Sequence, residues 1–114
     1  ETAWTRHLID DTWSQSHSHG LADFDGDGDL DLVTGKRFMS HNGGDPGAFE
    51  PLGVYWYELE RGPQPVWKKH ILSYNEGIGS ALNLVVSDLD ADGDPDVVVT
   101  GKWGGPVWFE NLRK

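Results

Sequence analysis

The chain of 114 residues contains no cysteine and one methionine, and no apolar run in it approaches the length of a membrane span. Without cysteine there is no disulfide framework, so a secreted domain of this size needs another kind of cross-link. Without about 20 consecutive apolar residues, we expect no membrane-spanning helix. No segment has helical periodicity of useful length, so the sequence predicts an all-β domain.

Basic residues are also scarce, with 9 Lys and Arg against 19 Asp and Glu and a formal net charge of −10. Ten of the acidic residues are aspartates in two short stretches, and the other nine acidic residues balance the nine basic ones. An acidic protein with no basic patch is a poor partner for nucleic acid or for an anionic membrane. We therefore expect neither nucleic-acid binding nor membrane insertion.

The two acidic stretches share one pattern, since residues 23–31 read DFDGDGDLD and residues 88–96 read DLDADGDPD. Aspartates stand at positions 1, 3, 5 and 9 of each stretch, and glycine stands at position 6. Carboxylates held this close repel one another unless a cation lies between them, and Ca²⁺ takes six to eight oxygen ligands. The glycine permits a sharp turn, and the backbone carbonyl at position 7 is expected to add an oxygen. We predict two Ca²⁺ ions, one per loop, held by Asp23, Asp25, Asp27, Asp29, Asp31, Asp88, Asp90, Asp92, Asp94 and Asp96.

A helical calcium loop has the same opening spacing but ends on a bidentate Glu at position 12, where this chain has Thr34 and Val99. The residues that follow the acidic stretches read LVTG and VVVTG, which are short β-branched runs closed by glycine. We therefore expect each loop to lead into a strand. The alternative is that both stretches are solvated acidic turns without an ion.

A D-x-D-x-D-G-x-x-D loop followed by such a run resembles the FG-GAP or VCBS-type repeat of integrin-α-like β-propellers. The stretches SQSHSHGLADFDGDGDLDLVTGKR and GVYWYELE are similar to secreted bacterial VCBS-repeat proteins. The resemblance implies four-stranded blades, with a calcium ion in the hairpin between the first two strands of each blade. Oxygen-ligand calcium loops usually fill at extracellular calcium levels, so we expect a secreted or cell-surface protein, either a mature product or a piece of something longer.

The repeat extends beyond the loops, because WTRHLI at residues 4–9 matches WKKHIL at residues 67–72, and WYE at residues 56–58 matches WFE at residues 108–110. The offset is 63 to 65 residues for the first of these matches and for the acidic stretches (4 to 67 and 23 to 88), which is at the long end of the periods found in propellers and other arrays. Alternating and β-branched residues, bounded by Gly, Pro and Asp, predict strands at residues 3–9, 17–24, 30–36, 53–60, 66–72, 80–89, 95–102 and 106–111. An inserted loop lengthens the first copy around residues 40–51.

These strands make a single module over residues 1–114, with a first four-stranded blade at about 17–72 and a second at about 80–111. The second blade has three strands of its own, and its fourth is expected to be residues 3–9, either in cis or from a neighbouring subunit. An unpaired strand edge recruits another chain, and head-to-tail contacts give a ring or an open fibre. We therefore predict a homo-oligomer formed by strand exchange.

Some other side chains suggest sites outside the loops. Histidines near the inserted loop would form a transition-metal or sugar site, although hydrogen-bonded structural histidines are the simpler interpretation. Sugars stack on tryptophan, but the four tryptophans at repeat-equivalent positions, 4, 56, 67 and 108, are expected in the core between blades. The remaining candidates are His17, His19, His41 and Asp45 for a second metal, and Trp13 and Trp103 for a glycan.

The sequence has no cysteine nucleophile and no G-x-S-x-G elbow, and its clustered carboxylates are assigned to calcium. We therefore expect a protein that is not an enzyme, namely a calcium-binding module with a structural or adhesive role that contacts a glycan or another surface protein. The alternatives are a carbohydrate-binding module and, third, a metal-dependent sugar lyase or dehydratase fragment.

Overall fold

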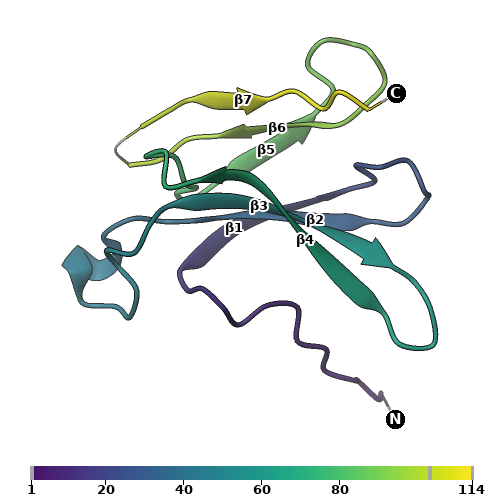
Figure 1. The fold of residues 1–114 in the computed structure, drawn as a ribbon, viewed down its shortest axis with the longest axis horizontal. Helices are drawn as coiled ribbons and strands as arrows, with labels where there is room; N and C mark the ends of the chain where they lie inside the picture. Colours follow the sequence, from purple (N-terminus) through teal and green to yellow (C-terminus); the bar gives the residue numbers. More distant parts are fainter. Residues whose placement is uncertain (1, 103, 114) are drawn as a thin grey trace.

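The structure, a computed structural model, describes residues 2–102 and 104–113 and contains two antiparallel β-sheets (Figure 1). The all-β prediction is confirmed, and the described residues form no closed propeller. The first sheet has the order β1-β2-β3-β4 and the second the order β5-β6-β7. The strands are β1 (Ser16–Ala22), β2 (Asp31–Lys36), β3 (Gly53–Glu60), β4 (Val66–Tyr74), β5 (Leu84–Ser87), β6 (Asp96–Val99) and β7 (Val107–Phe109), with one 3-10 turn, η1 (Ser40–Gly43), in the inserted loop.

The two central strands of the first sheet are buried on both faces. In β3, Val54 and Trp56 point toward the second sheet, while Tyr55 and Tyr57 point to the opposite face, because successive side chains of a strand alternate. Tyr55 and Tyr57 are nevertheless buried, at 3% and 2% exposure. We call this second side the outer face of the first sheet, and residues 10–15 must cover it.

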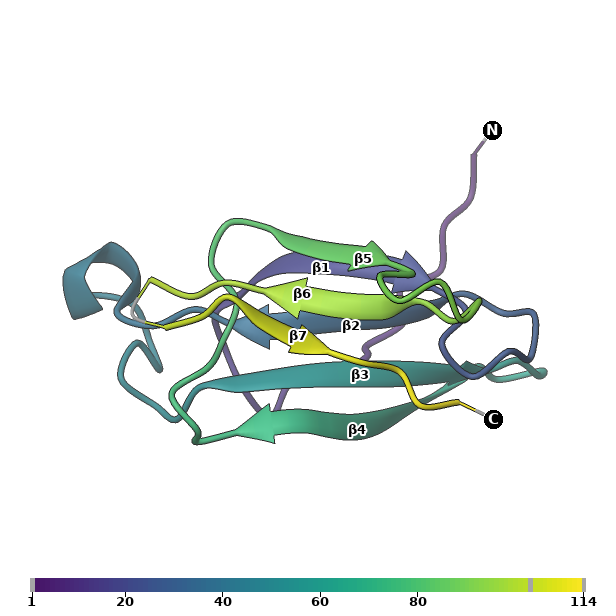
Figure 2. The same ribbon diagram turned by 90° about the horizontal axis from the view of Figure 1, so that it is seen from above.

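The two sheets pack face to face around one apolar core (Figure 2). Phe24, Val33 and Val54 come from the first half of the chain and meet Leu84, Val97 and Val99 from the second half. Burying an aliphatic or aromatic side chain of this size contributes about 1.5–3 kcal/mol. The sheets are therefore held together mainly by these side chains, as the alternation of apolar residues in the predicted strands requires.

The N-terminal segment contradicts its prediction, since residues 2–11 form no strand. Residues 2–9, which we call the N-terminal arm, are mostly exposed, and Trp4 is 90% exposed. The arm ends directly before Asp10. Asp10 accepts a hydrogen bond from Tyr57 on the outer face of the first sheet, which is the face away from β7 (Figure 1). In this structure the arm therefore does not pair with β7 of its own chain, and the first sheet stands between the arm and that edge.

The expected burial of the repeat-equivalent tryptophans is only half right. Trp56 and Trp67 are partly buried, whereas Trp4 is 90% exposed and Trp108 is 46% exposed. Val107 and Phe109 pack against the core, so alternation turns Trp108 to the far side of the second sheet. The strands of this sheet are also shorter than predicted.

Candidate metal centres

The first acidic loop joins β1 to β2, and its aspartates fold the backbone around themselves. Asp23 accepts hydrogen bonds from the backbone amides of Gly26 at 2.7 Å and Gly28 at 3.0 Å. Asp25 accepts one from the amide of Asp27 at 3.1 Å. Gly28, at position 6, has φ +94°, a conformation that L side chains rarely adopt, so the predicted turn glycine is confirmed.

The second loop, between β5 and β6, repeats two of these three contacts, those made by the backbone amides at positions 5 and 6. Asp88 accepts from the amides of Asp92 at 3.2 Å and Gly93 at 3.0 Å, and Asp90 accepts from Asp92 at 3.3 Å. Gly93 has φ +98°. Two segments that share a spacing thus share a conformation, which indicates that the spacing determines the loop geometry.

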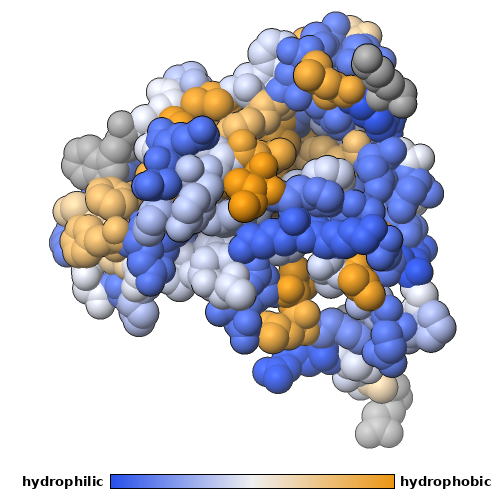
Figure 3. Space-filling model, viewed as in Figure 1, coloured by the Kyte–Doolittle hydropathy of each residue, from blue (hydrophilic) through white to orange (hydrophobic). Residues whose placement is uncertain are grey.

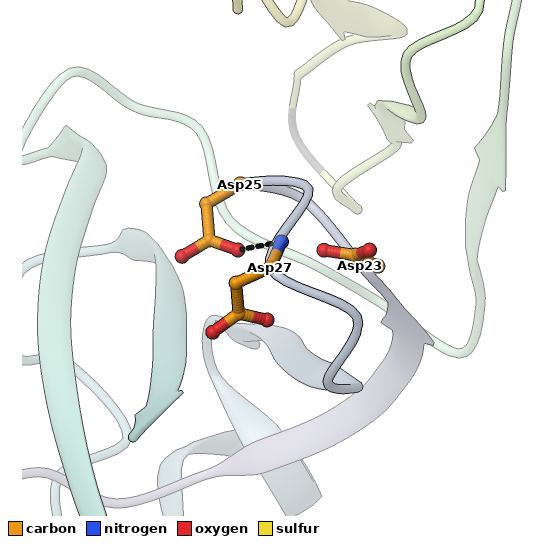
Figure 4. Close-up of side chains that lie close together, drawn as sticks. All are labelled: Asp23, Asp25 and Asp27. Atoms are coloured by element: carbon orange, nitrogen blue, oxygen red, sulfur yellow. Dashed lines mark hydrogen bonds between the residues drawn. The ribbon is translucent and has the colours of Figure 1, made fainter. Parts of the chain in front are cut away.

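Each loop gathers three carboxylates into a group whose potential ligand oxygens all lie within 4.8 Å of one another. In the first loop the group is Asp23, Asp25 and Asp27 (Figure 4). In the second it is Asp88, Asp90 and Asp96. A donor set made only of carboxylate oxygens fits a hard cation such as Ca²⁺ and does not suit Zn²⁺ or copper, which favour nitrogen or sulfur. Across residues 2–102 and 104–113 no third group of this kind occurs.

The aspartates at position 9 have a second task, which is to fasten the loop to the sheet. Asp31 is 0% exposed and accepts hydrogen bonds from the amides of Phe24 at 3.1 Å and Leu59 at 2.9 Å. Asp96 does the same with Leu89 at 3.0 Å and Asn111 at 2.8 Å. Each carboxylate therefore joins the start of its loop to the third strand of the sheet or to the residues just after it.

The amide hydrogen bond from Asn111, together with the one from Leu89, lowers the pKa of Asp96 although burial acts in the opposite direction. The pKa values of Asp25 and Asp90 are raised, first by desolvation and then by the negative charge of neighbouring carboxylates. A bound divalent cation would remove this repulsion. The two loops therefore share a raised carboxylate pKa at position 3.

The remaining loop aspartates lie at the margins of the two groups. The side chain of Asp29, at position 7, forms an ion pair with Arg61 at 2.7 Å, and that of Asp94 forms one with Arg113. Asp92 accepts a hydrogen bond from the amide of Asp94 at 2.9 Å and lies outside the second group. The two arginines were missed from the sequence, although each stands five residues after the tryptophan of its WYE or WFE motif.

Only part of the predicted histidine site is brought together. His41 contacts Asp45 at 2.6 Å, and Arg37 approaches the same carboxylate at 3.5 Å. His17 and His19 are exposed on β1 and join no group of three or more potential metal ligands among the described residues. The arrangement is therefore a histidine–aspartate pair beside an arginine.

Of the two tryptophans proposed for glycan contact, Trp103 lies outside the described residues, and Trp13 is used in packing. The Trp13 indole N–H donates to the Tyr57 hydroxyl at 2.7 Å and to Asp10 at 3.2 Å, and the ring lies 4.8 Å from that of Tyr55. Trp13 also lines a groove together with Tyr74 and Lys69. Trp13 therefore covers the outer face of the first sheet.

Asp10 is the centre of this covering segment. Its carboxylate accepts hydrogen bonds from the backbone and hydroxyl of Thr12, from Tyr57 at 2.7 Å and from Trp13, and it pairs with Lys69 at 2.8 Å. Burial acts to raise the pKa of Asp10, but the hydrogen bonds from Lys69, Thr12 and Tyr57 outweigh it and hold this pKa well below its usual range. The segment is thus fixed to the sheet by a charged group that stays ionised.

Replacing Asp10 with alanine is expected to lower the free energy of unfolding at neutral pH by about 2 kcal/mol, since several donors lose a charged acceptor. A carboxylate whose pKa is depressed by folding stabilises above its unfolded pKa of about 4, and this contribution is lost as the pH falls further. The difference between wild type and Asp10→Ala in urea unfolding should therefore shrink below about pH 4. Asp11→Ala, at the exposed neighbouring position, is the control and should match wild type throughout.

Comparison with known proteins gives one similarity. The chain is 32% identical to integrin alpha-IIb of Homo sapiens over 94 residues, which is 79% of this chain and 9% of integrin alpha-IIb. No protein-family model matches, and no solved structure matches. The class that fold and site define is an all-β repeat domain with paired acidic loops, and its sequence is similar to a fragment of an integrin α chain.

Proposed function

We propose that this chain is a calcium-stabilised β-repeat module with an adhesive or structural role outside the cell. The observation that carries this proposal is the duplication of the loop: equivalent aspartate–amide contacts at positions 5 and 6 and the same positive-φ glycine occur in both halves. Asp23, Asp25 and Asp27 would hold one ion, and Asp88, Asp90 and Asp96 the other. Bound calcium would neutralise each carboxylate group and tie the turns of the loop together.

The similarity to a segment of integrin alpha-IIb supports an adhesion-related role and an extracellular or cell-surface location. In the described part of the chain, no helix is long and apolar enough to cross a membrane. The clustered carboxylates are taken up by the loops and by hydrogen bonds to backbone amides. The proposed role is accordingly one of binding and assembly, without catalysis.

The module is further proposed to assemble head to tail. The second sheet has three strands against four in the first, and β7 pairs only with β6 among the described strands. An open edge of this kind presents unpaired backbone N–H and C=O groups to other chains. Contacts between two different surfaces of the same protein produce a ring when the rotation closes and a fibre when it does not.

Calcium binding is tested by comparing thermal unfolding with and without a chelator. A site that is saturated at 100 times its dissociation constant stabilises the folded state by about 2.7 kcal/mol, so wild type should lose several degrees of Tm in EGTA. Asp25→Asn and Asp90→Asn keep an acceptor oxygen for the backbone but remove a charge, so each should abolish part of the calcium response. Titration calorimetry should show two ions per wild-type chain and one per variant.

Asp11→Asn, which removes one exposed carboxylate outside the loops, is the matched control and should respond to calcium as wild type does. The ligand assignment would be refuted if the difference in Tm between each variant and wild type were the same in EGTA as in calcium. It would also be refuted if calcium did not change the Tm of the wild-type protein.

A further inference from the structure

The edge of the second sheet at β7 corresponds to the position that β4 occupies in the first sheet. The WYE motif lies in β3, and the matching WFE motif starts in β7 and ends just beyond it. In the first sheet, β3 is followed by β4, which pairs with it over its full length from Gly53 to Glu60. The first sheet therefore has a fourth strand paired with the one that carries the motif, and the described part of the second sheet does not. The pairing of β3 with β4 shows how a fourth strand would pair with β7.

A groove lies beside the open edge, where a fourth strand of the second sheet would run over β4. No described strand of the second sheet lies over β4 (Figure 2). The face that carries β4 and β7 shows hydrophobic side chains between the two sheets (Figure 3). The apolar residues that line this groove come from both halves of the chain and are Phe24, Trp56, Leu72, Val97, Phe109 and Leu112. The polar residues Glu110 and Asn111 also line it.

The N-terminal arm has the sequence that this position requires. Residues 4–9 read WTRHLI, and residues 67–72 within β4 read WKKHIL. In the arm, Trp4 is 90%, Leu8 69% and Ile9 38% exposed. Three large apolar side chains in water on a segment that repeats a strand are best explained by a site elsewhere that buries them.

We infer that the N-terminal arm of one copy forms the fourth strand of the second sheet of another copy, antiparallel to β7. This inference rests on the head-to-tail assembly proposed above and names its donor and acceptor. The arm of the same chain is excluded as the occupant by its anchor, because Asp10 is bound to Tyr57 on the outer face of the first sheet. The six residues from Trp4 to Ile9 span at most about 20 Å, and they would have to pass around the first sheet before pairing.

The β3–β4 pairing also gives the register. In the first sheet Leu59 pairs with Trp67, Glu58 with Lys68, and Trp56 with His70. The same register in the second sheet places Asn111 opposite Trp4, Glu110 opposite Thr5, and Trp108 opposite His7. Alternation then turns Trp4, Arg6 and Leu8 to the side of Phe109, which lines the groove, with Arg6 directly opposite Phe109.

The outward side of the donated strand has a template as well. His70 stacks on Trp56 with ring centroids 4.2 Å apart and contacts Glu58 at 2.8 Å. The equivalent residues are His7 on the arm, and Trp108 and Glu110 at the acceptor edge. Trp108 is 46% exposed in the single chain, and the ring of His7 would cover it as the ring of His70 covers Trp56 in the first sheet.

Because the chain has no cysteine, introduced cysteine pairs report the register directly. Thr5→Cys with Glu110→Cys places two exposed residues opposite each other in the inferred pairing. Ala3→Cys with Glu110→Cys is offset by two residues, beyond the Cα separation of about 7 Å that a disulfide bridges. Mild oxidation in calcium should give covalent dimers and longer ladders for the first pair, at least tenfold more than for the second. Equal yields, no cross-link, or a cross-link within single chains would overturn the inference.

A second measurement uses the size of the assembly. Trp4→Ala with Leu8→Ala should dissociate it to monomers by light scattering, whereas Thr2→Ala at the start of the arm should not. Retained assembly in the double variant would also contradict the inference. Calcium titration of the same proteins separates the two proposals. Calcium binding without cross-linking would refute only the pairing of the N-terminal arm with β7 of another copy. Cross-linking without calcium binding would refute only the proposed calcium function.

Discussion

Replacing Asp31 with alanine is expected to lower the free energy of unfolding by about 4 kcal/mol, with or without calcium. Asp31 is fully buried, and its two carboxylate oxygens accept hydrogen bonds from the amides of Phe24 and Leu59. Alanine leaves both amides without their acceptor inside the fold, and each unpaired buried group costs about 1–3 kcal/mol. Urea unfolding followed by tryptophan fluorescence, in EGTA and in calcium, measures the loss.

Asp96→Ala is the equivalent change in the second loop, where the acceptor for Leu89 and Asn111 is removed. It should also destabilise the chelated protein. Asp25→Asn is the contrast, because Asp25 makes one hydrogen bond in the exposed loop, and this change should matter in calcium alone. If Asp31→Ala were as stable as wild type in EGTA, the structural role of this carboxylate would be refuted.

Replacing Gly79 with alanine is expected to cost about 4 kcal/mol or more, because the added methyl group meets backbone. A Cβ at this position would lie 2.0 Å from the carbonyl oxygen of Lys36 and 3.0 Å from the side chain of Leu52. The same carbonyl accepts a hydrogen bond from the amide of Ser80 at 3.0 Å, in the connection between the two sheets. The change should therefore loosen the packing of one sheet on the other, and urea unfolding should measure the loss.

Gly62→Ala is the matched control, since its nearest neighbour, the carbonyl oxygen of Gln64, would lie 3.8 Å from the new Cβ. This variant should unfold within about 0.5 kcal/mol of wild type. A Gly79→Ala protein with wild-type stability would show that the connection between the sheets moves freely enough to accept a methyl group. The close approach in the structure would then not contribute to sheet packing.

The local elements of this protein follow from its sequence. The spacing of Asp23, Asp25 and Asp27 and the glycine after them predict the loop, and the structure places these carboxylates together with Gly28 at positive φ. The predicted strand at residues 53–60 agrees with β3, since its alternating residues must serve two buried faces. Interactions within a few residues determine these features, so a linear pattern is sufficient to predict them.

The sequence was less informative about contacts between segments that are distant in the chain. Asp31 and Asp96 occupy the same position of the repeat and make equivalent hydrogen bonds, but only Asp96 joins its carboxylate group. The ion pairs of Asp29 with Arg61 and of Asp94 with Arg113 join the loops to residues distant in the chain. Such contacts depend on how the third strand of each sheet ends, which the loop pattern does not contain.

By itself the sequence determined the all-β class, the duplicated acidic loops and the likeness of residues 4–9 to β4. Only the tertiary structure decided where those residues lie: Asp10 is bound to Tyr57 and Lys69 on one face of the first sheet, while the open edge at β7 belongs to the sheet on its other face. A strand exists only when a neighbouring edge satisfies its backbone hydrogen bonds, and a linear sequence does not specify which edge is within reach.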